Sequence, residues 1–101
     1  TDPLQSWDEE ELTGRFLDLE ARIPLKGFVL PGRTEASARI DLARTASRRL
    51  ERRVVALSRA AIARGEPPVS DILRRYLNRL SDYLFMLARA EEAAEGKIEY
   101  A

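Results

Sequence analysis

Hydrophobic positions recur at helical spacing in three stretches of the chain. In the first stretch Leu12, Phe16 and Leu19 follow the segment Ser6-Trp7-Asp8-Glu9. That segment has the form of a capping box, with acids in the first turn where the helix dipole favours negative charge. Pro24 marks the end, because the residue before a proline is pushed away from helical angles. The spacing predicts a helix over about residues 6–21.

The second stretch is long, with apolar residues on a narrow stripe, and it predicts a helix over about residues 34–64. Gly65 is a typical helix stop, and Pro67-Pro68 prevent continuation. At about 1.5 Å per residue such a helix is ~45 Å long. Apolar and small residues alternate at steps of three and four along it: Ile40, Ala43, Ser47, Leu50, Val54, Leu57 and Ala61.

The third stretch predicts a helix over about residues 70–93, with Ser70 as its N-cap and Asp71 beside it. Its apolar seam is Leu73, Leu77, Leu80, Leu84 and Leu87, widened by Tyr76 and Tyr83. No β pattern or repeat is present, so residues 1–101 are predicted to form one all-α domain, an antiparallel helical bundle. Three helices with two long seams leave apolar surface open, so further helices, self-association or both are expected.

An apolar loop separates the first two predicted helices. Residues 25–32 read Leu-Lys-Gly-Phe-Val-Leu-Pro-Gly, and two glycines and a proline in eight residues make a regular strand improbable. An apolar loop of this kind is expected to cover an apolar surface or to be covered by one.

Composition removes several classes of function. Seventeen basic residues balance 17 acidic residues, so the overall charge gives no support for binding to nucleic acid or to an anionic membrane. The chain contains no Cys and no His, which removes thiolate chemistry, the commonest general base and the commonest metal ligand. No cluster of residues suggests a protein metal site. No apolar run reaches the ~18 residues of a membrane span, and no signal-peptide pattern opens the sequence, which favours a cytoplasmic protein.

Charge is concentrated in the second predicted helix, where Arg44, Arg48, Glu51 and Arg52 fall at i, i+4, i+7 and i+8 on one face. Glu51 is placed to orient arginines that otherwise repel one another. One interpretation is a solvated basic face joined by ion pairs, and another is a helix that binds nucleic acid. The third is a polyphosphate cradle, because a guanidinium binds phosphate through two parallel hydrogen bonds.

A second polar pair lies on the third predicted helix. Asn78 and Asp82 are four residues apart, beside the leucine seam. Such a pair serves either as a structural hydrogen bond or as part of a ligand site.

Three segments together resemble one enzyme family. They are Phe28-Val-Leu-Pro-Gly-Arg-Thr-Glu-Ala, Arg44-Thr-x-x-Arg-Arg-x-Glu-Arg-Arg-Val-Val-Ala-Leu and Arg75-Tyr-Leu-Asn-Arg-Leu-Ser-Asp-Tyr-Leu-Phe. Their order and separation resemble those of the PduO-type ATP:cob(I)alamin adenosyltransferases. The resemblance implies the core of a five-helix bundle that assembles as a homotrimer, with active sites between subunits.

The resemblance also implies a reaction and a set of roles. The reaction transfers the 5′-deoxyadenosyl group of ATP to the cobalt of reduced cobalamin and releases triphosphate, with Mg²⁺ on the phosphates. This chemistry needs no catalytic side chain. Arg48, Glu51, Arg52 and Asn78 match positions that contact or orient ATP, and Phe28 matches an aromatic that lies against the corrin. In addition, Arg44 matches an arginine of an intersubunit salt bridge, and Asp82 a supporting aspartate.

The chain also departs from the family pattern. The family's Thr-Gly-Asp-type ATP loop precedes all three segments and has no counterpart here, and Arg33 replaces a second glycine after Pro31-Gly32. The leading hypothesis is the adenosyltransferase or its helical core, feeding a cobalamin-dependent mutase or dehydratase. The alternative is a non-catalytic trimeric bundle that binds corrinoid or a partner protein.

Overall fold

Three helices form the protein, as a computed structural model that describes residues 4–101 shows. They are α1 (Ser6–Arg22), α2 (Glu35–Ala63) and α3 (Asp71–Ala94), and each end lies within one residue of the predicted one. Within residues 4–101 the only β pairing is an isolated bridge between Val29 and Tyr100. The all-α prediction is therefore confirmed.

Side-chain caps set the start of each helix. Thr34 Oγ1 accepts a hydrogen bond from the Ser37 backbone N–H over 3.0 Å, and Ser37 Oγ accepts one from the Thr34 N–H over 3.0 Å. The capping box predicted at Ser6 is wrong by one residue, because Gln5 is the N-cap of α1. Asp8 lies three residues after Gln5, and its carboxylate accepts from the Gln5 N–H over 2.8 Å.

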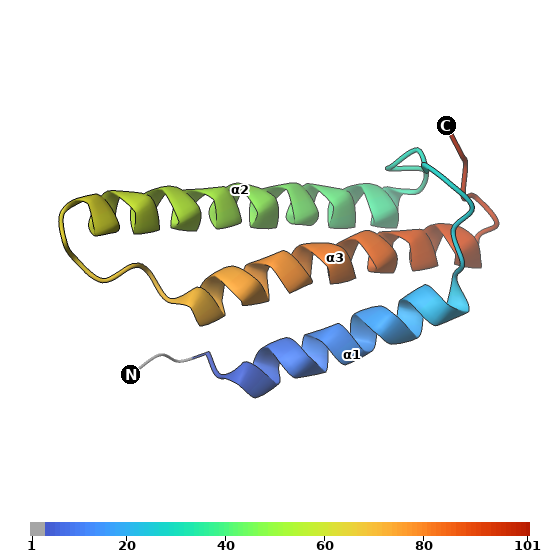
Figure 1. The fold of residues 1–101 in the computed structure, drawn as a ribbon. Coiled ribbons are helices and arrows are strands. Elements are labelled where there is room, and N and C mark those ends of the chain that lie inside the picture. Colours follow the sequence, from blue (N-terminus) through green and yellow to red (C-terminus); the bar gives the residue numbers. More distant parts are fainter. Residues whose placement is uncertain (1–3) are drawn as a thin grey trace.

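α3 is the central helix and lies between α1 and α2 (Figure 1). It runs antiparallel to α2 and in the same direction as α1, because the connection from α1 to α2 turns back at one end of the bundle. In the described chain, no Cα atom of α1 lies within 8 Å of one in α2. The buried residues accordingly face α3 or belong to it; the apolar ones are Leu12, Leu19, Val54, Ala61, Leu77, Met86 and Ala88.

Two serines lie at the contact between α2 and α3. Ser81 Oγ is 3.1 Å from both Ser47 Oγ and the Leu77 carbonyl oxygen, and both serines are buried. Small side chains allow two helices to approach closely, and these hydroxyls satisfy each other within the contact. The contact holds α2 and α3 together in the middle of the bundle.

The apolar seam predicted for α2 is only partly covered. Ser47, Val54 and Ala61, spaced by seven residues, are buried against α3. Leu50 and Leu57 are 50% and 56% exposed, and Leu42 is exposed as well. The expectation that all seven positions form one packing seam is therefore wrong for this chain, since one neighbouring helix covers only one stripe of α2. We call Leu42, Leu50 and Leu57 the leucine flank of α2.

The turn between α2 and α3 follows from Gly65. Gly65 has φ +74°, a left-handed conformation that glycine adopts without strain. The N–H of Glu66 then reaches the Ala61 carbonyl over 2.9 Å, which completes a Schellman motif. None of the helices in residues 4–101 combines the length and the apolar character needed to cross a membrane.

Candidate functional site

A depression between α2 and α3 gathers all four of the residues predicted to bind ATP. Its volume is about 490 Å³, within the range of small-molecule sites. Six lining residues come from α2 and Asn78 comes from α3. The full lining is Arg48, Glu51, Arg52, Val55, Ala56, Arg59 and Asn78. We call this the arginine depression.

The charge of the arginine depression is not neutralised internally. Arg48, Arg52 and Arg59 form no ion pair within residues 4–101, and Glu51 contributes the only carboxylate of the lining. Three guanidinium groups thus face one carboxylate. The interpretation of this face as a set of ion pairs is therefore wrong for these arginines, which remain available to an anion.

Glu51 has a different partner from the one expected. Its Oε2 accepts a hydrogen bond from Asn78 Nδ2 over 3.1 Å, and the described chain contains no ion pair between Glu51 and an arginine. The expectation that Glu51 orients Arg44 and Arg48 is therefore wrong. Instead, the bond from Asn78 holds the carboxylate on the α3 side, which leaves the arginines free.

Such an arrangement can bind a polyanion. Arg48, Arg52 and Arg59 follow one another by four and seven residues, so they share one side of α2. Together they extend over about 16 Å of helix axis. Guanidinium groups bind phosphate oxygens through paired, charge-assisted hydrogen bonds. The arginine depression is therefore suited to an extended polyphosphate.

Arg44 lies apart from the other arginines, in a second pocket. Its Cζ is 5.3 Å from the centre of the Phe85 ring, within cation–π range. Its Nε is buried and has no hydrogen-bond partner among the described residues. The second pocket, about 560 Å³, is lined by Phe16, Glu20, Ile23, Pro24, Leu25, Arg44, Asp82, Phe85 and Met86. We call it the interhelical pocket.

Asp82 belongs to the interhelical pocket as well. Its Oδ2 is 3.2 Å from Arg79 Nη1 on the same helix. Asn78 bonds to Glu51 instead, so Asn78 and Asp82 do not form the pair that their spacing suggested. The polar residues of α3 thus serve two different pockets.

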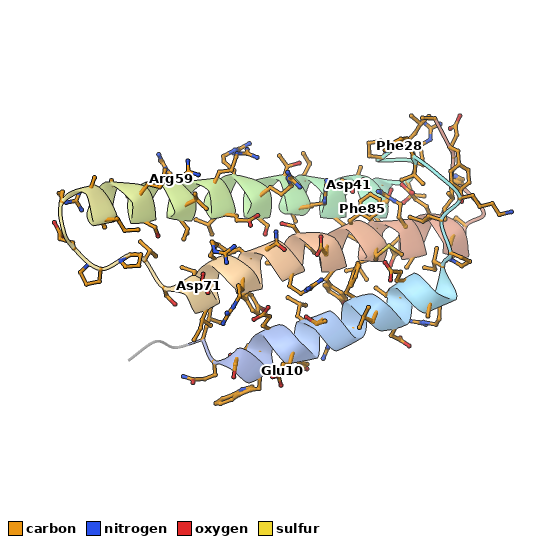
Figure 2. The ribbon with its side chains drawn as sticks, viewed as in Figure 1. Glu10, Phe28, Asp41, Arg59, Asp71 and Phe85 are labelled. Carbon is orange, nitrogen blue, oxygen red and sulfur yellow. The ribbon has the colours of Figure 1, made fainter. Side chains whose placement is uncertain are left out.

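Phe28 is 89% exposed, at the tip of the loop between α1 and α2. Figure 2 places it at the N-terminal end of α2, whereas Arg59 lies towards the other end. Arg48 is about 20 Å along the helix axis from the start of α2. One copy of the chain therefore does not bring Phe28 and the arginine depression into a single site.

Arg59 is a lining residue that the sequence interpretation missed. It falls seven residues after Arg52, so helical spacing alone places the two on one side of α2. It was missed because it lies outside the segment Arg44–Arg53, in which the arginines are closely spaced. Continuing the seven-residue step along the helix identifies it.

Comparison with known proteins connects this geometry to an enzyme family. A corrinoid adenosyltransferase of the PduO type from Citrobacter freundii is 54% identical over 69 residues, which make up 68% of this chain and 19% of that protein. A corrinoid adenosyltransferase from Bacillus subtilis is 44% identical over 78 residues, 75% of this chain and 37% of that protein. The chain thus spans much less than half the length of these curated relatives.

Solved structures agree with the sequence comparison. A variant of the PduO-type ATP:corrinoid adenosyltransferase from Lactobacillus reuteri, complexed with cobalamin and ATP, superimposes with a TM-score of 0.84 at 28% identity. The match covers 99% of this chain and 52% of that one. The model of the family described as cobalamin adenosyltransferase matches residues 2–91. The chain belongs to the cobalamin adenosyltransferase family.

Proposed function

We propose that this chain supplies the phosphate-binding and corrin-facing helices of an enzyme that transfers the 5′-deoxyadenosyl group of ATP to the cobalt of a reduced corrinoid. The observation that carries the proposal is the arginine depression, where Arg48, Arg52 and Arg59 have no ion-pair partner within residues 4–101. Relatives named corrinoid adenosyltransferase, and a neighbour that binds ATP and cobalamin together, support it.

The proposed reaction needs no side-chain base. Cobalt(I) supplies an electron pair to C5′ of ATP, a cobalt–carbon bond forms, and the electrons of the C5′–O bond leave with triphosphate. The protein must hold the two substrates in line and stabilise charge on the leaving triphosphate. Unpaired arginines beside the phosphates fulfil the second requirement. A chain without His or Cys is compatible with this chemistry.

Within the arginine depression the roles differ. Arg48, Arg52 and Arg59 bind phosphate oxygens in this proposal. Asn78 holds Glu51 by their hydrogen bond, so that the carboxylate faces the ribose or the hydrated phosphates and does not neutralise an arginine. Asn78 and Glu51 thereby orient the nucleotide.

Mg²⁺ fits this site as an ion carried by the nucleotide. Residues 4–101 contain no group of three or more Asp, Glu, His or Cys that could enclose a metal. Mg²⁺ is usually held by substrate phosphates together with one or two carboxylates. Glu51 is the one carboxylate that lines the arginine depression and is therefore the expected protein contact.

The corrinoid belongs at Phe28 in this proposal. An exposed aromatic ring at the tip of an apolar loop is costly in water and favourable against a flat macrocycle. Packed against the corrin, the ring keeps a lower ligand away from cobalt. This favours the low-coordinate state that the transfer requires.

We further propose a homotrimer in which one subunit supplies Phe28 and a neighbour supplies the arginine depression. Their separation in one chain and the exposed leucine flank of α2 support this arrangement. Arg44 lines the interhelical pocket beside Asp82, and its buried Nε has no hydrogen-bond partner within residues 4–101, which supports pairing with an acidic group from another segment. The product would supply a cobalamin-dependent mutase or dehydratase.

The test is anaerobic and uses the protein at its natural length. Chemically reduced cob(I)alamin and MgATP are mixed with the protein, and the absorbance spectrum is followed for adenosylcobalamin. Product above the ATP-free control is the expected result. A folded protein that forms no product, and binds corrinoid without ATP, would instead support the non-catalytic binding protein.

A further inference from the structure

A buried cluster of charged residues joins α2 and α3 directly beneath the loop that carries Phe28. Arg89 and Glu92 on α3 are completely buried, and Asp41 on α2 is mostly covered. Arg89 Nη2 lies 2.7 Å from Asp41 Oδ2, and Arg89 Nε lies 2.8 Å from Glu92 Oε1. None of these residues lines the arginine depression. We call Asp41, Arg89 and Glu92 the buried charge cluster.

The cluster carries more negative than positive charge. Two carboxylates share one guanidinium, and a buried carboxylate is stable only when its oxygens accept enough hydrogen bonds. The Arg89 guanidinium also lies against the Phe85 ring, 4.8 Å from its centre. Its Nη2 donates to both Asp41 and Glu92, and the cluster has further donors from outside it.

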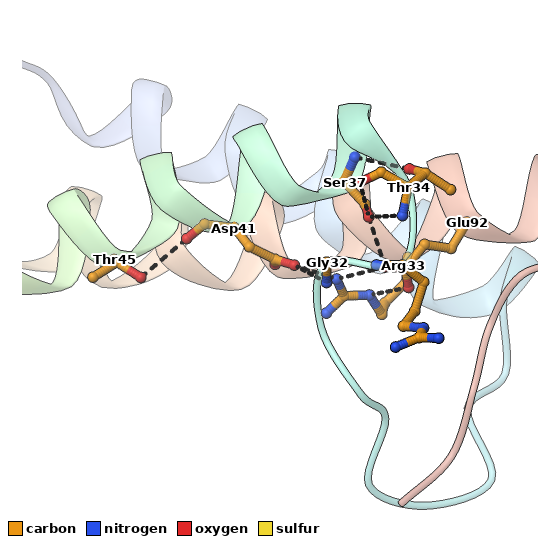
Figure 3. A network of polar contacts seen from close by, with 8 residues as sticks. Gly32, Arg33, Thr34, Ser37, Asp41, Thr45 and Glu92 are labelled. Atoms are coloured by element: carbon orange, nitrogen blue, oxygen red, sulfur yellow. Dashed lines mark hydrogen bonds and ion pairs between the residues drawn. The ribbon is translucent and has the colours of Figure 1, made fainter.

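The loop supplies those donors through its backbone. The Gly32 N–H donates to Asp41 Oδ2 over 2.9 Å, and the next N–H, of Arg33, donates to Glu92 Oε2 over 3.0 Å. Ser37 Oγ donates to the same Glu92 oxygen over 2.7 Å. Figure 3 shows these bonds meeting at the point where the loop enters α2. Two consecutive amides thus reach carboxylates on two different helices.

Gly32 makes this double contact possible. Its φ of +68° is in the left-handed region, where only glycine is free of strain, and it turns successive N–H groups towards the anions. Four residues earlier the same loop presents Phe28. The C-terminal residues hold the other side of this loop, because the Ala101 N–H donates to the Phe28 carbonyl over 2.8 Å. Release of the Gly32–Arg33 segment therefore frees the α2 side of the loop that carries the ring.

We infer that Asp41 is a positioning residue of the adenosyl transfer: with Arg89 and Glu92 it fixes the loop so that Phe28 meets the corrin at a set height and angle. This inference rests on the proposed function. Asp41 touches no substrate and acts through Gly32 and Phe28. Its loss should affect the corrin side of the reaction and spare ATP binding, because the arginine depression lies farther along α2.

The decisive variant is Asp41→Ala. Arg89 keeps Glu92 as its partner in that variant, so the cluster loses one carboxylate and the loop loses one anchor. Amide hydrogen exchange in residues 25–33 should accelerate about fivefold to tenfold. In the transfer assay kcat should fall about tenfold, while KM for ATP stays within about twofold of wild type. The absorbance spectrum of bound cob(II)alamin should shift towards the form that retains its lower ligand.

Two controls bracket the result. Glu35→Gln removes an exposed ion pair with Arg39 on the same helix and should leave both exchange and kcat unchanged. Phe28→Ala should reproduce the spectral shift without accelerating exchange at Gly32. If Asp41→Ala does not fold, Asp41→Asn, which keeps the shape and loses the charge, should give smaller changes in the same directions.

The outcomes separate the two proposals. A folded Asp41→Ala protein with wild-type exchange in residues 25–33, or with an unaltered kcat, overturns the positioning role while the adenosyltransferase assignment stands. Absence of transfer in the wild-type protein overturns the proposed function. In that case the exchange measurement still decides whether Asp41 anchors the loop.

Discussion

Asn78 on α3 donates a hydrogen bond to Glu51 on α2 over 3.1 Å, at the edge of the arginine depression. This bond connects the nucleotide-facing side of α2 to the central helix through side chains. Within residues 4–101 Glu51 forms no ion pair with an arginine, so the positive charge of the depression is available to a ligand.

Removing Asn78 should weaken nucleotide binding through Glu51. In Asn78→Ala the carboxylate is free to pair with Arg48 or Arg52, so KM for ATP should rise about fivefold. In a double-mutant cycle with Glu51→Ala, measured by ATP titration, the coupling should be about 1 kcal/mol. Additive effects of the two substitutions would show that the bond plays no part in binding.

Arg48 should matter far more than its neighbour Arg49. Arg48→Ala removes a guanidinium from the depression and should lower kcat by roughly a hundredfold or more, the usual loss when one stabilising donor is removed. Arg49→Ala, an exposed arginine outside the lining, should retain nearly full activity. Circular dichroism should show both variants folded, and equal loss in the two would refute a specific phosphate contact.

Arg59 extends the depression and should contribute to binding more than to turnover. Arg59→Ala should raise KM for ATP about threefold to tenfold, with little change for a nucleotide that lacks the outer phosphates. The measurement is a comparison of ATP and AMP affinities by calorimetry, with Arg49→Ala again as the matched control. Equal loss for both nucleotides would place Arg59 away from the phosphates.

Two glycines should respond in opposite ways to alanine. Gly32→Ala forces a side chain into φ +68° and should destabilise the fold by about 1 kcal/mol, even though the nearest atom, Ala38 Cβ, is 3.7 Å away. Gly14→Ala lies inside α1, with no atom within 4 Å of the added methyl, and should stabilise by about 0.5–1 kcal/mol. Urea unfolding of both variants checks the signs.

The leucine flank should report on assembly. Leu57→Lys places a charge among exposed leucines and should shift sedimentation from the proposed trimer towards monomer. Ala63→Lys adds the same charge to an exposed position about 120° around the helix and should leave the assembly intact. If the Leu57→Lys protein is still a trimer, the interface lies on another face of the molecule.

Local features of the fold were predictable, and features that depend on a partner helix were not. Thr34 and Ser70 start their helices as their capping chemistry predicts, because a cap acts within one turn. Leu50 and Leu57 fit the packing pattern as well as Val54 does. Which of them is buried depends on the one helix that lies against α2, and a repeat along the chain does not contain that information.

The same limit applies to the candidate site. Arg44 and Arg52 seemed to share a face, but eight residues separate them by about 12 Å along the helix axis and about 80° around it, and they line different pockets. The bond between Asp41 and Arg89 joins positions far apart in the chain and follows no motif. By contrast, Arg48, Glu51, Arg52 and Asn78 do meet, because the first three are neighbours on one helix and α3 packs beside them.

The central place of α3 has a consequence for how the chain folds. α2 and α3 are consecutive, and a short turn closed by Gly65 connects them, so contacts can start beside the turn and extend along the pair at little loop entropy for each step. α1 has only α3 to dock on, and α3 is distant from it in the chain. The α2–α3 hairpin should therefore form first and serve as the nucleus, with α1 and the Phe28 loop added later. Substitutions at the Ser47–Ser81 contact should then slow folding, whereas those at Leu12 or Leu19 should mainly speed unfolding.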